Sequence, residues 1–98
     1  MNAADIEVTF DGPVTAEQTA DLLRSLALDG MESTLRHSRE GGRVLSLTAE
    51  DAPDAETAAG RIMGTLAEIR MDWQTLTVRA GGRSIHFYPS TTGIEVAA

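Results

Sequence analysis

Apolar and polar residues alternate with a period of two at the start of the chain. Every second residue from Ile6 to Phe10 is apolar, whereas Glu7 and Thr9 between them are polar. Successive side chains of a β-strand point to opposite faces of the sheet, so this period is typical of a half-buried strand. The pattern predicts a strand over residues 5–10.

The period then changes to that of a helix. Thr15 and Gln18 have the spacing of a capping box, in which each side chain satisfies a free backbone N–H of the first turn. Gly30 supplies a C-terminal stop. We expect a helix over residues 15–29 that turns one apolar stripe to the core. The residues of this stripe are Ala16, Ala20, Leu23, Leu26 and Ala27.

The chain repeats itself with a period near forty residues. A shift by forty aligns Leu26 with Leu66 and Met31 with Met71, and it also aligns the Gly41-Gly42 pair with Gly81-Gly82. Such self-similarity means that one supersecondary unit is used twice. The unit reads strand, helix, strand and Gly-Gly hairpin turn, because glycine adopts the positive φ of such turns without strain.

The remaining elements follow from this repeat. The expected strands cover residues 34–39, 43–49, 75–80 and 84–88, and the second helix covers residues 54–70. Its core stripe consists of Ala59, Ile62, Leu66 and Ile69. Residues 90–98 are expected either to fray or to add a short strand through Ile94 and Val96.

The predicted fold is a single α+β domain spanning residues 1–98. The order β-α-β-β-α-β-β resembles the ferredoxin-like two-layer sandwich with one additional strand. Right-handed crossovers place both helices on one face of an antiparallel sheet. With the sheet order 4-1-3-2, the fifth strand extends the edge beside the fourth. The resemblance is architectural only, and this fold supports many functions.

The sheet face turned away from the helices is the predicted functional surface. We expect it to bind a partner or ligand through Arg36, Arg79, His86 and Tyr88, because Tyr and Arg are enriched at interfaces. The strand alternation also directs hydroxyls to this face, and it places His37 and Leu35 on the opposite, inward side. The predicted hydroxyl residues are Thr9, Ser38, Ser46, Thr48 and Thr77.

Two other features allow more than one interpretation. Gly60 and Gly64 lie four apart within the second predicted helix, where each costs roughly 1 kcal/mol relative to alanine. They indicate tolerated drift, close packing against the first helix, or a seam, continued by Ala67, for the helix of another chain. Trp73 is expected to close the end of the core, and a ring at the mouth of a pocket is the alternative.

Composition limits the chemistry. The 98 residues contain no cysteine and no lysine, so that all eight basic residues are arginines, a usage typical of high-GC bacterial genomes. Thiolate nucleophiles, disulfides and Schiff-base lysines are therefore absent. The net charge of −7 opposes nucleic-acid binding. No signal peptide or membrane span is visible, so we expect a cytoplasmic protein.

The function expected from these observations is protein interaction without catalysis. The domain would act as an adaptor or regulatory module through its open sheet face or the exposed edge of its fifth strand, and it would also self-associate as a homodimer. No cofactor or metal is expected, since His37 and His86 form no ligand array. The alternatives are a regulatory domain similar to ACT domains, which bind small molecules, and an enzyme resembling the dimeric α+β barrels.

Overall fold

The computed structural model describes residues 3–52 and 54–89 as two helices and five strands. The predicted contribution of Ile94 and Val96 lies outside these residues. The elements in chain order are β1 (Ala4–Phe10), α1 (Ala16–Leu28), β2 (Ser33–Arg39), a 3-10 turn η1 (Glu40–Gly42), β3 (Val44–Ala49), α2 (Ala55–Glu68), β4 (Trp73–Ala80) and β5 (Arg83–Phe87).

Both helices begin at side-chain caps. Thr15 and Gln18 form the predicted capping box, in which the Gln18 backbone N–H donates to Thr15 Oγ1 at 3.1 Å and the Thr15 N–H donates to Gln18 Oε1 at 2.9 Å. The Asp54 carboxylate accepts the Thr57 N–H at 2.7 Å. This hydrogen bond lowers the pKa of Asp54 below its ordinary value, because it stabilises the ionised form.

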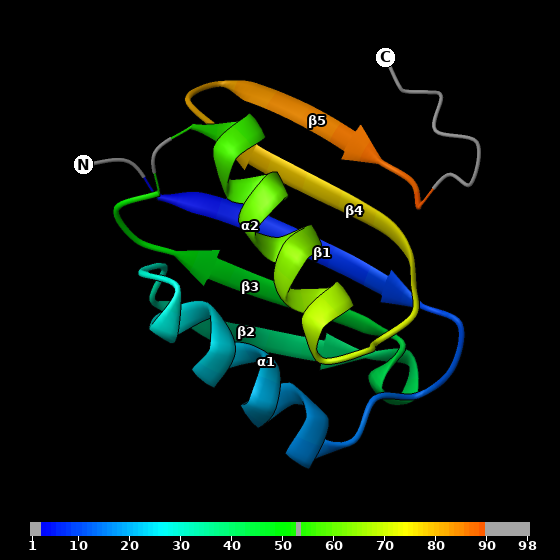
Figure 1. Cartoon of the computed structure of the whole chain (residues 1–98). Coiled ribbons are helices and arrows are strands. Elements are labelled where there is room, and N and C mark those ends of the chain that lie inside the picture. The colour runs from blue at the N-terminus through cyan, green and yellow to red at the C-terminus, as the bar shows by residue number, and fades with distance from the viewer. Residues whose placement is uncertain (1–2, 53, 90–98) are drawn as a thin grey trace.

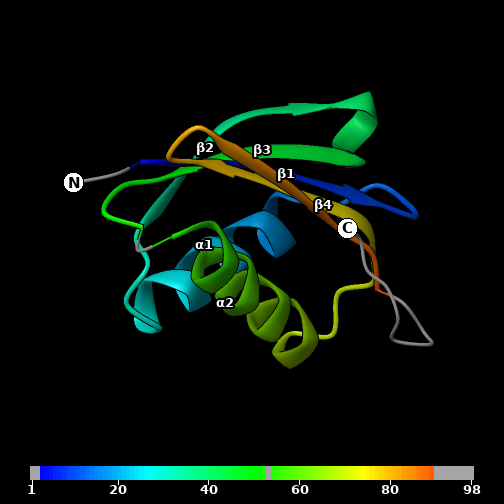
Figure 2. The same ribbon diagram turned by 90° about the horizontal axis from the view of Figure 1, so that it is seen from above.

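The strands form one antiparallel sheet in the order β2-β3-β1-β4-β5 (Figure 1). β5 therefore lies beside β4, at the edge where the sequence placed the fifth strand. Both helices cover the same face of the sheet, and no described element covers the other face (Figure 2). The expected α+β architecture, with an antiparallel sheet and two helices in a second layer, is confirmed.

The core lies between the sheet and the helices. From β1 it takes Ala4, Ile6, Val8 and Phe10, each at most 4% exposed. Leu45, Leu47, Leu76 and Val78 on the neighbouring strands and Ile62 and Leu66 on α2 complete its centre. Trp73 pairs with Phe10 and packs partly buried against this cluster, so its predicted place at the end of the core is confirmed.

The buried stripe of α1 differs from the predicted one. Thr19, Leu22 and Leu26 are buried, whereas Leu23 is only half-buried. The helix is rotated because two leucines one turn apart remove more apolar surface from water than the alanines of the predicted stripe. Burial of Thr19 costs little, since its hydroxyl donates to the Thr15 carbonyl at 3.0 Å. Three predicted core residues are thus exposed: Ala16, Ala20 and Ala27.

A β-bulge at Arg36 overturns the predicted orientation of His37. Leu35 pairs with Leu47, but the next paired residue, His37, faces Ser46, and Arg36 has no partner in the ladder. Both ends of β2 are paired, Ser33 with Ala49 and Arg39 with Val44, so its seven residues span only six on β3 and one of them is left over as the bulge. From this point the alternation reverses, so that His37 lies on the open face and Ser38 turns toward the helices.

The glycines of α2 do not pack closely against α1. A Cβ built on Gly60 or Gly64 would meet no heavy atom within 4 Å, so the close-packing alternative is wrong, while tolerated drift and a seam for another chain stay predictions. Gly42 is different, because its φ is +93° and a Cβ there would come within 2.6 Å of the Val14 carbonyl oxygen. Only glycine fits this contact between the η1 turn and the start of α1.

The rotation of α1 predicts unequal effects of two neighbouring substitutions. Leu22→Ala should lower the free energy of unfolding by about 2–5 kcal/mol, because it leaves a cavity in the core. Leu23→Ala should cost only about 1 kcal/mol, since that side chain is half-buried. Urea denaturation at low protein concentration measures both values. A larger loss for Leu23→Ala would contradict the observed orientation of the helix.

Candidate functional site

We define the open face as the side of the sheet opposite the helices. Its side chains fall into three rows that cross the strands, because residues paired in register point to the same side. The middle row runs His37, Ser46, Glu7, Thr77, His86 across all five strands. The flanking rows are Thr34, Thr48, Asp5, Arg79, Ser84 and Arg39, Val44, Thr9, Thr75.

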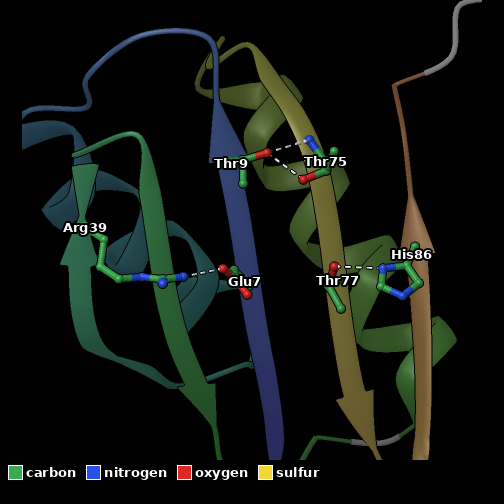
Figure 3. A network of polar contacts seen from close by, with 6 residues as sticks. All are labelled: Glu7, Thr9, Arg39, Thr75, Thr77 and His86. Atoms are coloured by element: carbon green, nitrogen blue, oxygen red, sulfur yellow. Dashed lines mark hydrogen bonds and ion pairs between the residues drawn. The ribbon is translucent and has the colours of Figure 1, made fainter. Parts of the chain in front are cut away.

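Arginines from β2 reach across β3 to the carboxylates of β1. Arg39 Nη2 lies 2.6 Å from Glu7 Oε2, and Arg36 Nη1 lies 3.3 Å from Asp5 Oδ1. Figure 3 shows the extended Arg39 side chain passing over β3 to Glu7. Both ion pairs are about half exposed, so each contributes at most about 1 kcal/mol to stability.

Beneath the side chains of Arg36 and Arg39, which cross β3, the open face has a partly covered depression. Ser46 is only 9% exposed, although it lies on the uncovered side of the sheet between His37 and Glu7. It lines a depression of about 220 Å³, to which the three arginines of the open face also contribute. Among the described residues, the Ser46 hydroxyl has no side-chain hydrogen bond. The depression therefore combines cations, carboxylates and one sheltered hydroxyl.

The β4 side of the face is held by hydroxyl contacts (Figure 3). Thr77 Oγ1 and His86 Nδ1 are 3.0 Å apart, and their donor and acceptor roles depend on the imidazole tautomer. The hydroxyls of Thr9 and Thr75 are hydrogen-bonded to one another, and the Thr75 N–H donates to Thr9 Oγ1 at 3.1 Å. These contacts fix side-chain orientation beside the shift in register after Thr9.

The structure divides the four predicted site residues. Arg36 and Arg79 both line the depression and stand on either side of Asp5. His86 lies next to this group and joins it through Thr77. Tyr88 follows the end of β5 and is 59% exposed, but it does not line the depression. Two of the four residues are therefore brought together, one adjoins them and one lies apart.

Four further residues of the face escaped the sequence analysis. Asp5 and Glu7 could have been found, because the alternation of β1 already directed Glu7 away from the core. Arg39 ends the strand predicted over residues 34–39 and was not assigned to the open face. His37 could not have been placed, since its orientation depends on the bulge. The two imidazoles stand at opposite ends of one row, so four strand spacings of about 4.8 Å separate them by roughly 19 Å.

The open face differs in charge from the rest of the molecule. It holds three arginines, Arg36, Arg39 and Arg79, against two carboxylates, Asp5 and Glu7. Its formal charge is therefore +1 with neutral histidines, while the whole chain carries −7. Three of eight basic residues but only two of fifteen acidic ones lie here. The face is the relatively positive side of an acidic protein.

Comparisons with known proteins identify no family for this chain. No protein-family model matches the chain, and neither a curated protein nor a solved structure is significantly similar to it. Within residues 3–52 and 54–89, no three His or acidic side chains are grouped as a metal ion would require. Neither described helix has the length and hydropathy needed to cross a bilayer.

The cover over Ser46 can be tested by thiol chemistry, since the chain contains no native cysteine. Ser46→Cys should react with a thiol reagent at least about tenfold more slowly than Ser84→Cys, because Ser84 is exposed on the same face. Adding Arg39→Ala should accelerate the reaction of Cys at position 46. Equal rates for the two single variants would contradict the sheltered position of Ser46.

Proposed function

We propose that this protein is a non-enzymatic interaction domain whose open sheet face binds an acidic surface of a partner protein. The charge of the open face is the observation that carries this proposal. Because the rest of the chain is strongly acidic, an acidic partner is repelled except where it meets this face. Repulsion from the acidic remainder of the surface and attraction to the open face would together orient an acidic partner as it approaches.

The chemistry of the face fits recognition of carboxylates. Arginine offers a planar fork that pairs with a carboxylate through two hydrogen bonds. Arg79 has no ion pair among the described residues, whereas Arg36 and Arg39 are held by Asp5 and Glu7. Arg79 is therefore the guanidinium most available to a partner, and exposed Tyr88, which follows the far end of β5, can add a separate apolar contact.

The fold is consistent with an adaptor role. We infer that it is of the ferredoxin-like type with an added strand, which the strand order and the two split β-α-β units support. Such a plan leaves one face of the sheet free for contacts. A cytoplasmic location is part of the same proposal.

A small-molecule site is a second candidate function. The depression of about 220 Å³ and the sheltered Ser46 hydroxyl favour it, because a compact ligand with both a carboxylate and an amino group would match its mixed charges. Thermal melting with free amino acids and nucleotides is the test. A ligand-dependent rise in melting temperature that Arg79→Ala abolishes would support this candidate over the adaptor.

The adaptor proposal predicts the effect of removing two exposed side chains. Arg79→Ala combined with Tyr88→Ala should leave the melting temperature nearly unchanged, because neither residue is part of the core. It should weaken capture of partner proteins at least about tenfold, as loss of interface anchors does. Quantitative mass spectrometry of proteins retained from a lysate measures this loss.

Arg83→Ala is the matched control, since Arg83 is exposed but pairs with Glu56 of α2 and therefore lies on the helical side of the sheet. The control should retain the partners of the unmodified protein, and added salt should weaken their binding. If the double variant keeps both the partner profile and the solution mass of the unmodified protein, the open face is not an interaction surface.

A further inference from the structure

Helix α1 carries a second apolar stripe that its own core does not use. The stripe consists of Ala16, Ala20, Leu23 and Ala27; the alanines are exposed and the leucine is half-buried. Leu28, which follows, is 83% exposed. A surface helix normally turns its apolar stripe to the core, so this additional stripe lacks a partner within the described part of the chain.

The stripe borders an apolar groove at the edge of the molecule. The groove has a volume of about 570 Å³ and runs between α1 and β2, where Val14 and Leu35 also line it. Leu35 is 38% exposed although it lies on the inward side of β2. β2 is an edge strand, and α2 lies on the other flank of α1 (Figure 1). The groove is therefore open sideways to another molecule.

The spacing of the stripe is self-complementary. Its intervals are four, three and four residues, a sequence that reads the same in both directions. Two copies of α1 packed antiparallel would place Ala20 of each against Leu23 of the other. Ala16 of each would then meet Ala27 of the other. A small residue opposite a large one allows close helix packing, so the stripe fits a second copy of itself.

The charges beside the stripe agree with an antiparallel pair. Glu17 and Arg24 flank the stripe on its outer side, and both are exposed. Within its own helix, Arg24 Nη1 lies 2.9 Å from Asp21 Oδ1, an exposed pair that Arg24 can share with Glu17 of a second copy. In the antiparallel pair that sets Ala20 against Leu23, Glu17 of each copy lies two residues, about 3 Å along the axis, from the position opposite Arg24 of the other, and these long side chains can still meet. A parallel pair would bring Glu17 against Glu17 and Arg24 against Arg24. Complementary charges at such flanking positions set the orientation of paired helices.

We propose that this groove is a homodimer interface, occupied by a second copy of the chain through antiparallel packing of α1. The interface lies on the helical layer and the β2 edge, so it leaves the open face of each copy uncovered. It is independent of the proposed function, but it would let one dimer present two open faces to a partner. Two linked sites raise the apparent affinity for a multivalent target.

The first test compares alanine-to-glutamate substitutions on the two helices. Ala20→Glu should raise the dissociation constant of the dimer at least about tenfold, because it buries a charge opposite Leu23 of the other copy. Ala67→Glu is the control, since Ala67 is exposed near the end of α2. Native mass spectrometry and sedimentation give the masses, and thermal melting verifies that both variants are folded.

Two outcomes of this test would overturn the proposal. The first is an unmodified protein that keeps the monomer mass of 10.4 kDa even at millimolar concentration. The second is loss of the dimer in Ala67→Glu but not in Ala20→Glu, which would place the interface on the small residues of α2 instead.

A charge-exchange series tests the antiparallel orientation. Glu17→Arg alone and Arg24→Glu alone each create like-charge contacts between copies and should each weaken the dimer by about twofold to fivefold. The two changes combined restore opposite charges and should recover most of the affinity. Additive losses in the combined variant would contradict the proposed pairing of Glu17 with Arg24.

Cysteine cross-linking gives a readout that does not depend on affinity, because the chain has no cysteine of its own. A mixture of Ala16→Cys and Ala27→Cys chains should form a disulfide-linked heterodimer on mild oxidation. Ala16→Cys alone should not, since the two thiols of an antiparallel pair lie about 16 Å apart along the helices. A disulfide-linked dimer of Ala16→Cys alone, or no disulfide-linked heterodimer in the mixture of Ala16→Cys and Ala27→Cys, would contradict the proposal.

The open-face variants separate this proposal from the adaptor function. Arg79→Ala with Tyr88→Ala should leave the dimer mass unchanged while it weakens partner capture. Ala20→Glu should abolish the dimer while each monomer still binds through its open face. If the open-face double variant alone dissociates the dimer, the α1 interface is wrong, whatever the outcome of the partner experiment.

Discussion

Burial of the inward side of β1 is the interaction on which the rest of the structure depends. β1 is the middle strand of the sheet, and its alternate residues from Ala4 to Phe10 are almost wholly removed from water. Full burial of a side chain the size of Ile6, Val8 or Phe10 contributes about 1.5–3 kcal/mol to the free energy of unfolding. Both helices pack over this layer, and no element among residues 3–52 and 54–89 covers the opposite side of the sheet (Figure 2).

The same strand organises the open face, because a strand with period two presents its polar residues on the side opposite the core. Asp5 and Glu7 lie at the centre of that face, and Arg36 and Arg39 of β2 reach across β3 to form ion pairs with them. The resulting pairs add little to stability, but they hold guanidinium groups above a surface that would otherwise be flat. The charge of the face thus follows from the position of β1 in the sheet.

In this domain α1 carries more apolar surface than the sheet covers. α1 buries Leu22 and Leu26 and leaves a second stripe beside the β2 edge. α2 is more central, lies over β1 and β4, and buries six of its residues (Figure 1). The exposed apolar stripe of α1 and the polar open face lie on different sides of the molecule, so the proposed self-association and the proposed partner binding would not compete for one surface.

The sequence by itself determined the two helices and five strands of the described residues, the capping box of α1, the placement of both helices on one face and the edge that β5 occupies. These features depend on local periodicity, capping and chain connectivity, which one sequence displays directly. The tertiary structure decided the bulge at Arg36, which turns His37 outward, and the rotation of α1, which exposes Ala20. Both depend on fit between elements: a strand of seven residues must match one of six, and two leucine positions compete with an alanine stripe for one core. No local pattern records that competition, because its outcome is set by the surfaces that meet only after the chain has folded.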